Sequence, residues 1–289
     1  MSSVPTLNLC GAGRVGQTLA RLWLEAGCVS IGGVLTRSLE SAQVACDWIG
    51  AGTPCKSAAE MPAAEMVLIA TSDTAIGASC SQLVAAGVVP VGSVVFHVSG
   101  ALAAAELASA EAVGAWTASA HPARAFPHPD VVYSQFSGTA CALEGDARAL
   151  QQLTPLFAAI GGVPFRLASE QKVRYHAACV VASNYLVTVA HFARELALGA
   201  GLSVEQAQAV LQPLASGALA NTFALGGETA LTGPLVRGDV ATLQRHLSEL
   251  EGLARADYLQ LGQQTFALAH SRLTAQQRAE LTQLLQQGA

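Results

Sequence analysis

The sequence predicts an α/β domain built on a doubly wound, mainly parallel sheet, followed by an all-α domain. Up to about residue 168, short apolar segments alternate with amphipathic ones, a pattern typical of a parallel sheet covered by helices. A glycine-rich turn follows the first apolar segment, and from Ser169 onward only helical patterns occur. No low-complexity linker separates the two halves, so we expect two closely packed domains at residues 1–168 and 169–289.

The first predicted strand, at residues 7–10, runs into the motif Gly11-Ala12-Gly13-Arg14-Val15-Gly16. In this G-x-G-x-x-G arrangement, Gly11 permits the tight turn and Gly13 lets the backbone approach a pyrophosphate. Gly16 lets the following helix pack close to the strand. The amides at the helix N-terminus then face the anion. We therefore expect a dinucleotide to contact Gly11, Gly13, Arg14, Val15 and Gly16.

The elements after the turn strengthen this prediction. Residues 17–26 have the apolar stripe of an amphipathic helix, which Gly27 ends, and residues 31–35 supply the next strand. An ordinary glycine-rich turn is the alternative. The complete strand–helix–strand frame favours the dinucleotide site.

The end of the second strand indicates which dinucleotide binds. In this fold a carboxylate there normally holds the ribose 2′-hydroxyl of NAD. Here Thr36, Arg37 and Ser38 follow the strand, and the first carboxylate is Glu40. A guanidinium pairs with a 2′-phosphate in a forked contact, and the two hydroxyls add donors. We predict NADP(H) rather than NAD; the alternative is that Arg37 is a solvated loop residue.

The strand–helix alternation continues through the rest of the first domain. Thr71 and Ser72 follow the strand at residues 66–70, and Ser99 follows the strand at residues 94–98. Both ends belong to the carboxyl edge of the sheet, where ligands bind in doubly wound folds. We expect Thr71 and Ser72 to contact the cofactor. The other predicted elements are helices at residues 75–86 and 146–160 and strands at residues 116–120, 138–143 and 163–167.

The second domain begins with a long helix that runs from Ser169, its expected cap, to about Leu198. Residues 177–190 of this helix are almost wholly apolar, and a helix that is apolar all round has to be buried by other helices or by a second subunit. We therefore predict a homodimer formed through the helical domain. Further N-caps are predicted at Ser203, Asp239 and Thr274, of which the first and last begin capping boxes.

The long helix and a later loop carry polar residues suited to a ligand site. His176 and Asn184 lie eight residues apart, as do Tyr175 and Ser183, so each pair stays close to one helix face. Arg237 stands in a polar loop and could hold a substrate carboxylate in a forked contact. A histidine on an apolar helix is also typical of a satisfied core residue, and that alternative stays open for His176.

Two further candidates lie at the carboxyl edge of the sheet. Ser99 closes one strand, and His121 follows the next and precedes a proline. His121 is suited to proton transfer near neutral pH. The alternative is that the His-Pro pair only marks the start of a loop. We predict no metal site.

The composition excludes several classes of function. The net charge of −5 and the pI near 5.8, with no basic patch, argue against a nucleic-acid partner. The seven cysteines are scattered and form no C-x-x-C pair, which is typical of free thiols in a reducing compartment. Residues 74–105 carry no charge, but Pro90 and several glycines divide them into a helix and a buried strand. Without a secretory signal, we expect a cytoplasmic protein with no membrane partner.

The motifs together resemble a bacterial family, described as NADP oxidoreductases, that pairs a Rossmann-like domain with a C-terminal helical domain of unknown function. The family is similar in turn to pyrroline-5-carboxylate reductase, the β-hydroxyacid dehydrogenases and prephenate dehydrogenase. The resemblance implies a helical dimerisation domain and a cleft between the domains. It covers nearly the whole chain and rests on the glycine motif, on His97-Val98-Ser99-Gly100-Ala101-Leu102, on His121-Pro122 with Phe126, on Tyr175-His176-Ala177-Ala178 with Ser183-Asn184, and on Leu231-Thr232-Gly233-Pro234 with Arg237-Gly238-Asp239.

One departure from the related families bears on catalysis. The β-hydroxyacid dehydrogenases have a lysine four residues before an asparagine on the first long helix of the second domain. Here Asn184 is present, but Val180 stands in the place of the lysine, and Lys172 is far away in sequence. Prephenate dehydrogenase has a catalytic histidine in a His-Pro motif, so the resemblance favours His121 for proton transfer.

The sequence therefore predicts an NADP(H)-dependent oxidoreductase that transfers hydride to or from a small carbonyl, hydroxy or imine compound. The protein has to orient the cofactor and move one proton. His121 or His176 would be the acid or base, Asn184 and Ser99 would polarise the reacting atom, and Arg237 and Tyr175 would bind substrate. An imine reductase related to proline biosynthesis is the nearest competing enzyme. The alternative outside the enzymes is a sensor that binds NADP without turnover.

Overall fold

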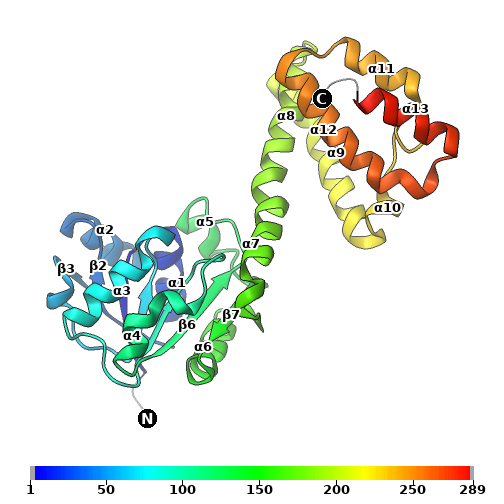
Figure 1. Ribbon diagram of the computed structural model, residues 1–289. Helices are drawn as coiled ribbons and strands as arrows, with labels where there is room; N and C mark the ends of the chain where they lie inside the picture. The colour runs from blue at the N-terminus through cyan, green and yellow to red at the C-terminus, as the bar shows by residue number, and fades with distance from the viewer. Residues whose placement is uncertain (1–3, 287–289) are drawn as a thin grey trace. The chain divides into compact units, whose positions relative to one another are not determined.

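The computed structural model describes residues 4–286, and the chain divides into two compact units, Met1–Ser183 and Asn184–Ala289 (Figure 1). The first unit holds an eight-stranded sheet with the strand order β3-β2-β1-β4-β5-β6-β7-β8. Neighbouring strands are parallel except for the antiparallel pair β6–β7. This is the doubly wound α/β sheet that the sequence predicts. The strands are β1 Thr6–Cys10, β2 Ser30–Leu35, β3 Thr53–Cys55, β4 Met66–Ile69, β5 Val94–His97, β6 Trp116–Pro122, β7 Ala140–Gly145 and β8 Val163–Arg166.

Helices cover both faces of this sheet, and each face has its own apolar core. Alternate residues of β4 point to opposite faces, so Leu68 packs against α1 and α2 while Val67 and Ile69 pack against α3. On the first face Trp23 meets Phe96 and Phe157 edge-on, and its indole Nε1 donates to the Leu156 carbonyl at 3.0 Å. The helices are α1 Arg14–Glu25, α2 Leu39–Ile49, α3 Ile76–Ala85, α4 Ala108–Ala112, α5 Pro129–Tyr133 and α6 Ala147–Ala159, with 3₁₀ turns η1 Ala58–Glu60, η2 Asp73–Ala75 and η3 Ala104–Leu107.

The long helix predicted from Ser169 forms, with an interruption. It consists of the 3₁₀ turn η4 (Ser169–Gln171), α7 (Lys172–Val180), a π-helical stretch η5 (Val181–Tyr185) and α8 (Leu186–Gly199). The prediction that Ser169 caps this helix is wrong, because Ala168 is the N-cap and the Ser169 hydroxyl donates to the Glu144 carboxylate at 2.6 Å. The Ser169 hydroxyl therefore binds the buried Glu144 carboxylate on β7 instead of capping the helix.

The second unit is helical throughout its described residues, as predicted. The capping boxes at Ser203 and Thr274 are both present, and Asp239 caps α11 by accepting from the Thr242 amide. Its core is a leucine cluster that includes Leu243, Leu259 and Leu281. The helices after α8 are α9 Val204–Leu225, α10 Gly227–Ala230, α11 Val240–Ser248, α12 Gly252–Ala269 and α13 Ala275–Gln286, with the 3₁₀ turn η6 His270–Arg272.

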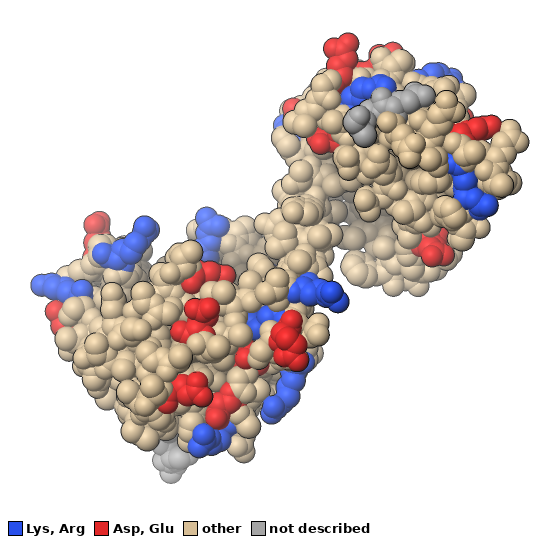
Figure 2. Space-filling model, viewed as in Figure 1, with Lys and Arg blue, Asp and Glu red and all other residues tan. Residues whose placement is uncertain are grey.

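Helices α8 and α9 leave large apolar side chains exposed. Val187 is 70% exposed, Leu214 is 67% exposed and Phe223 is 82% exposed. In Figure 2 the visible surface of the first half of α8, found by its place in Figure 1, shows no charged side chain, whereas the second half of the helix carries Arg194 and Glu195. The segment Ser169–Gly199 is long and apolar enough to cross a membrane by length and composition alone, and none of its most apolar stretch is buried within the chain. Within residues 4–286, neither compact unit by itself provides the expected burial of this helix.

Candidate functional site

The glycine motif builds a turn with an open space beside it. Gly11 has φ +87°, and a Cβ there would lie 2.6 Å from the Ala70 carbonyl carbon, so only glycine fits. A Cβ at Gly16 would lie 2.8 Å from the Gly11 oxygen, which keeps α1 close to the strand. Gly13 is the N-cap of α1 without a side-chain cap, and a Cβ there would meet nothing within 4 Å. Gly11 and Gly16 thus allow close packing, whereas Gly13 borders free space at a helix N-terminus.

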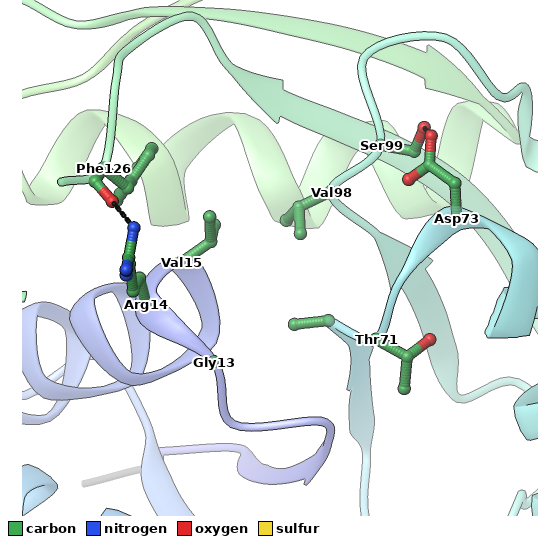
Figure 3. Close-up of a pocket in the computed structure, with 9 residues that line it drawn as sticks. Gly13, Arg14, Val15, Thr71, Asp73, Val98, Ser99 and Phe126 are labelled. Atoms are coloured by element: carbon green, nitrogen blue, oxygen red, sulfur yellow. Dashed lines mark hydrogen bonds between the residues drawn. The ribbon is translucent and has the colours of Figure 1, made fainter. Parts of the chain in front are cut away.

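Two cavities lie on either side of this turn and share Gly13, Ala70 and Thr71. The smaller cavity has a volume of about 310 Å³ and the larger one about 1020 Å³. Figure 3 shows Val15, Val98 and Phe126 around the smaller cavity, with Ser99 and Asp73 joined on one side and Arg14 on the other. Such a pair of cavities across a glycine turn fits the two halves of a dinucleotide.

Most predicted cofactor residues line these cavities. Arg14 and Val15 line the smaller one, whereas Gly11, Thr36, Arg37 and Ser72 line the larger one. Ser38 lines neither: it is the N-cap of α2, where its hydroxyl accepts from the Ser41 amide at 3.2 Å. A contact between Ser38 and the cofactor stays a prediction.

Ser99 sits in a tightly hydrogen-bonded loop after β5. Its hydroxyl donates to the Asp73 carboxylate at 2.8 Å and accepts from the amides of Ala101 and Leu102. Below it, buried His97 accepts from the Ser99 amide at Nδ1 and lies 3.0 Å from the Ala103 carbonyl at Nε2. These partners require the neutral ring protonated at Nε2, and burial lowers the pKa of His97 in agreement. His97 therefore supports the loop that presents Ser99.

His121, on β6, meets both candidate residues of α7. Its Nδ1 lies 3.1 Å from the Tyr175 hydroxyl, and its ring centroid lies 5.8 Å from that of His176. Burial, His176 and Lys172 together lower the pKa of His121 to about 4, so the ring is neutral at neutral pH. Burial also raises the pKa of Tyr175 above its ordinary value. The structure thus brings His121 next to Tyr175, which follows it by 54 positions in sequence, and next to His176, the neighbour of Tyr175.

The two imidazoles close over Gly100. A Cβ at this position would lie 2.4 Å from Cδ2 of His176 and 2.9 Å from Nε2 of His121. Because Tyr175 engages Nδ1 of His121, Nε2 is the ring atom that faces the end of β5. Glycine at position 100 is therefore required for the approach of the two histidines.

Lys172 is the main residue of this site that the sequence analysis did not predict. It is 1% exposed, and its ammonium donates to the Ser99 carbonyl at 3.3 Å and to the Ser119 hydroxyl at 2.7 Å. Burial lowers its pKa, against the opposing effects of Glu144 and Asp73. The signal was present, because Lys172 precedes Tyr175 and His176 by three and four residues, which places all three on one helix face.

Asn184 and Arg237 belong to the second compact unit. Asn184 lies in the π-helical stretch, a type of helix distortion that is frequent at functional sites. Arg237 is exposed, and its carbonyl accepts from the Gln277 side chain at 2.9 Å. The roles predicted for these two residues stay predictions.

Two family models match the chain. A Rossmann-like domain matches residues 5–122, and a domain of unknown function, DUF2520, matches residues 139–265. The chain is a Rossmann-like domain joined to a DUF2520 domain. The predicted resemblance to the family with this architecture is confirmed. No curated protein is a significant sequence match to the chain.

Solved structures share the fold over nearly the full length of this Rossmann–DUF2520 chain. Protein TM1727 from Thermotoga maritima is 27% identical, with a TM-score of 0.67 over 92% of this chain and 98% of its own. A protein from Bacteroides fragilis described as a "putative NADP oxidoreductase" is 21% identical, with a TM-score of 0.71 over 93% and 98%. The imine reductase from Myxococcus stipitatus, in complex with NADP⁺, is 17% identical, with a TM-score of 0.67 over 98% and 100%.

Proposed function

We propose that this protein is an NADP(H)-dependent oxidoreductase acting on a small carbonyl, hydroxy or imine compound. The observation that carries the proposal is the open space at Gly13, with a cavity on each side, Ser99 in the lining of the smaller cavity and His121 next to Gly100. The names of the similar structures, an NADP oxidoreductase and an imine reductase with NADP⁺, support the same class. When bound, the nicotinamide cofactor supplies or accepts the hydride.

The residues around the glycine turn suit the parts of such a cofactor. The uncapped N-terminus of α1 offers amides to the pyrophosphate, and no acidic residue in its first turn repels the anion. The larger cavity, with Thr36 and Arg37, suits the adenosine 2′-phosphate. The smaller cavity, with the apolar side chains of Val15, Val98 and Phe126, suits the nicotinamide.

We assign proton transfer to His121. The ring is neutral at neutral pH because its pKa is about 4, so it can accept the proton of a hydroxyl substrate at Nε2. In the direction of reduction, the same nitrogen first takes up a proton from solvent and then donates it to the substrate. For this step Nδ1 carries the ring proton and donates to the Tyr175 hydroxyl, which fixes the ring and leaves Nε2 as the acceptor.

Two measurements test the proposal. We expect calorimetry to detect NADPH binding, and we expect NADPH oxidation with at least one member of a panel of 2-oxo acids and cyclic imines. His121→Asn is expected to bind NADPH normally and to turn over at least about a hundredfold more slowly. His128→Asn is the matched control, because His128 is an exposed histidine in the same unit. Absence of any nucleotide binding contradicts the proposal, whereas tight binding without turnover supports the sensor.

We further propose that a second copy of the chain covers α8 and α9. Their exposed apolar side chains exceed what monomeric proteins usually leave in water, and α9 carries a single acidic residue, Glu205, and no basic one. Sedimentation is expected to give a dimer, and Phe223→Glu is expected to give a monomer with intact secondary structure. A monomeric wild type contradicts the dimer, and wild type that partitions onto phospholipid vesicles points to a membrane as the covering partner.

We also propose a cytoplasmic location. All seven cysteines are free thiols, as in proteins of reducing compartments.

A further inference from the structure

Two positively charged residues follow the ends of neighbouring strands at the β3 edge of the sheet. Strands β2 and β3 are parallel and pair Leu35 with Cys55 at their carboxyl ends. The residues that follow therefore emerge at the same level from neighbouring strands, which lie about 4.8 Å apart in a sheet. These residues include Arg37 after β2 and Lys56 after β3.

Both cations line the larger cavity, and its lining contains no carboxylate. Glu40 and Glu60, the nearest acidic residues along the chain, are not part of the lining. The side chains that line it between the two strand ends and the glycine turn are rich in hydroxyls. These hydroxyl residues are Thr36, Ser41, Ser57, Thr71, Ser72 and Ser79.

Neither Arg37 nor Lys56 forms an ion pair with any residue from 4 to 286. Glu60 acts on the backbone of Lys56 instead, where its carboxylate accepts from the amide at 2.8 Å. This contact ties the backbone at Lys56 to the turn η1 that follows it. Ser57 is the N-cap of η1, but its side chain makes no capping hydrogen bond. The ammonium and the hydroxyl at the end of β3 are thus available to a ligand in the cavity.

We propose that Lys56 is a second specificity-determining cation, which binds the 2′-phosphate of NADP(H) together with Arg37. The inference rests on the proposed NADP(H) binding and extends it to a residue on a separate strand. A phosphomonoester carries nearly two negative charges at neutral pH, which one guanidinium leaves partly unneutralised. Arg37 offers a planar fork and Lys56 a compact point charge, so they can bind different oxygens of the same group.

The test compares ligands that differ only in the 2′-phosphate. Calorimetry measures the Kd of NADPH and NADH, and of 2′,5′-ADP and 5′-AMP, for the wild type, Lys56→Ala, Arg37→Ala and the double variant. Lys56→Ala is expected to weaken NADPH and 2′,5′-ADP by about tenfold, because an exposed charge-assisted contact is lost. NADH and 5′-AMP are expected to change less than about twofold. Arg166→Ala is the matched control, because it removes an exposed positive charge from β8 at the opposite edge of the sheet.

The outcomes separate this inference from the proposed function. Loss of the preference for NADPH in the double variant, with Arg166→Ala unchanged, supports the paired cations. If Lys56→Ala keeps the full preference, or loses no more than Arg166→Ala, the inference is overturned while NADP(H) binding stands. If the wild type binds none of the four ligands, the proposed function itself fails.

Discussion

The two compact units differ in how far they bury their large apolar side chains. In the first unit, both faces of the sheet are covered by the chain itself, and Trp23, Phe96 and Phe157 are fully buried. In the second unit, α8 and α9 leave residues such as Leu214 and Phe223 in water. The first unit buries its own core, and polar residues such as Thr71 and Ser99 line cavities at the carboxyl ends of its strands. The second leaves apolar residues exposed, which is the basis of the proposed dimer.

Truncating one aromatic side chain in each unit tests this contrast most strongly. Trp23→Ala is expected to lower the free energy of unfolding by about 3 to 5 kcal/mol, because it leaves a large cavity and removes the hydrogen bond to the Leu156 carbonyl. Phe223→Ala, at an 82% exposed position, is expected to change the stability of the monomer by less than about 0.5 kcal/mol. Urea denaturation at low protein concentration measures both. A strongly destabilised Phe223→Ala monomer would show that Phe223 is packed within the chain and would contradict this difference between the units.

The buried imidazole of the first unit predicts a pH-dependent stability. The pKa of His121 is about 4 in the folded chain and about 6.5 in the unfolded one, so the unfolded state binds more protons between these values. The contribution of His121 to the free energy of unfolding is therefore fully present above pH 6.5. It is lost as the pH falls toward 4, and the loss from this residue is at most about 3 kcal/mol.

Denaturation curves between pH 4 and 7 for His121→Asn and His128→Asn check this effect. The first variant is expected to lose less stability than the wild type between pH 7 and pH 4, and the second, at an exposed position, controls for the removal of an imidazole. Equal acid limbs in the wild type and His121→Asn would show that the ring titrates normally.

Gly100 provides a more local perturbation of the same site. A methyl group there meets both imidazoles, so Gly100→Ala is expected to displace them and to lower kcat/KM by at least about tenfold. Its cost in stability is expected to be about 1 to 3 kcal/mol, as for other overpacked positions. Gly217→Ala is the control, since a Cβ there meets nothing within 4 Å. Full activity in Gly100→Ala would show that the histidines do not act from these positions.

The smallest expected effect concerns the charge of Lys172. Lys172→Met removes a positive charge near His121, so the pKa of His121 is expected to rise. An NMR titration of the imidazole measures this change directly. Arg174→Met removes an exposed charge from the same helix and is expected to leave the pKa of His121 unchanged. A fall in the pKa after Lys172→Met would refute the electrostatic argument.

The sequence predicted the features that depend on local patterns. The glycine turn, the alternation of strands and helices in the first domain and the capping boxes at Ser203 and Thr274 follow from short segments. Strand β3 was missed, because it has only three residues and contains Pro54.

The missed parts of the site arise from long-range packing. The bonds from Lys172 to Ser99 and Ser119 join residues 73 and 53 positions apart, and Ser169 gives up a capping role to Glu144, 25 residues away. No local pattern specifies such partners. The helix-face relation of Lys172 to Tyr175 and His176 was the one signal that pointed to the cluster.

The most direct test of dinucleotide binding is the NADPH affinity of Gly13→Val. Gly13 has φ −75° and borders open space, so valine is expected to fold there without strain while its side chain occupies the place of the pyrophosphate. The account predicts a Tm within about 2 °C of the wild type, which binds NADPH, and an affinity reduced at least about fiftyfold. A Gly13→Val protein that binds NADPH as tightly as the wild type would contradict it.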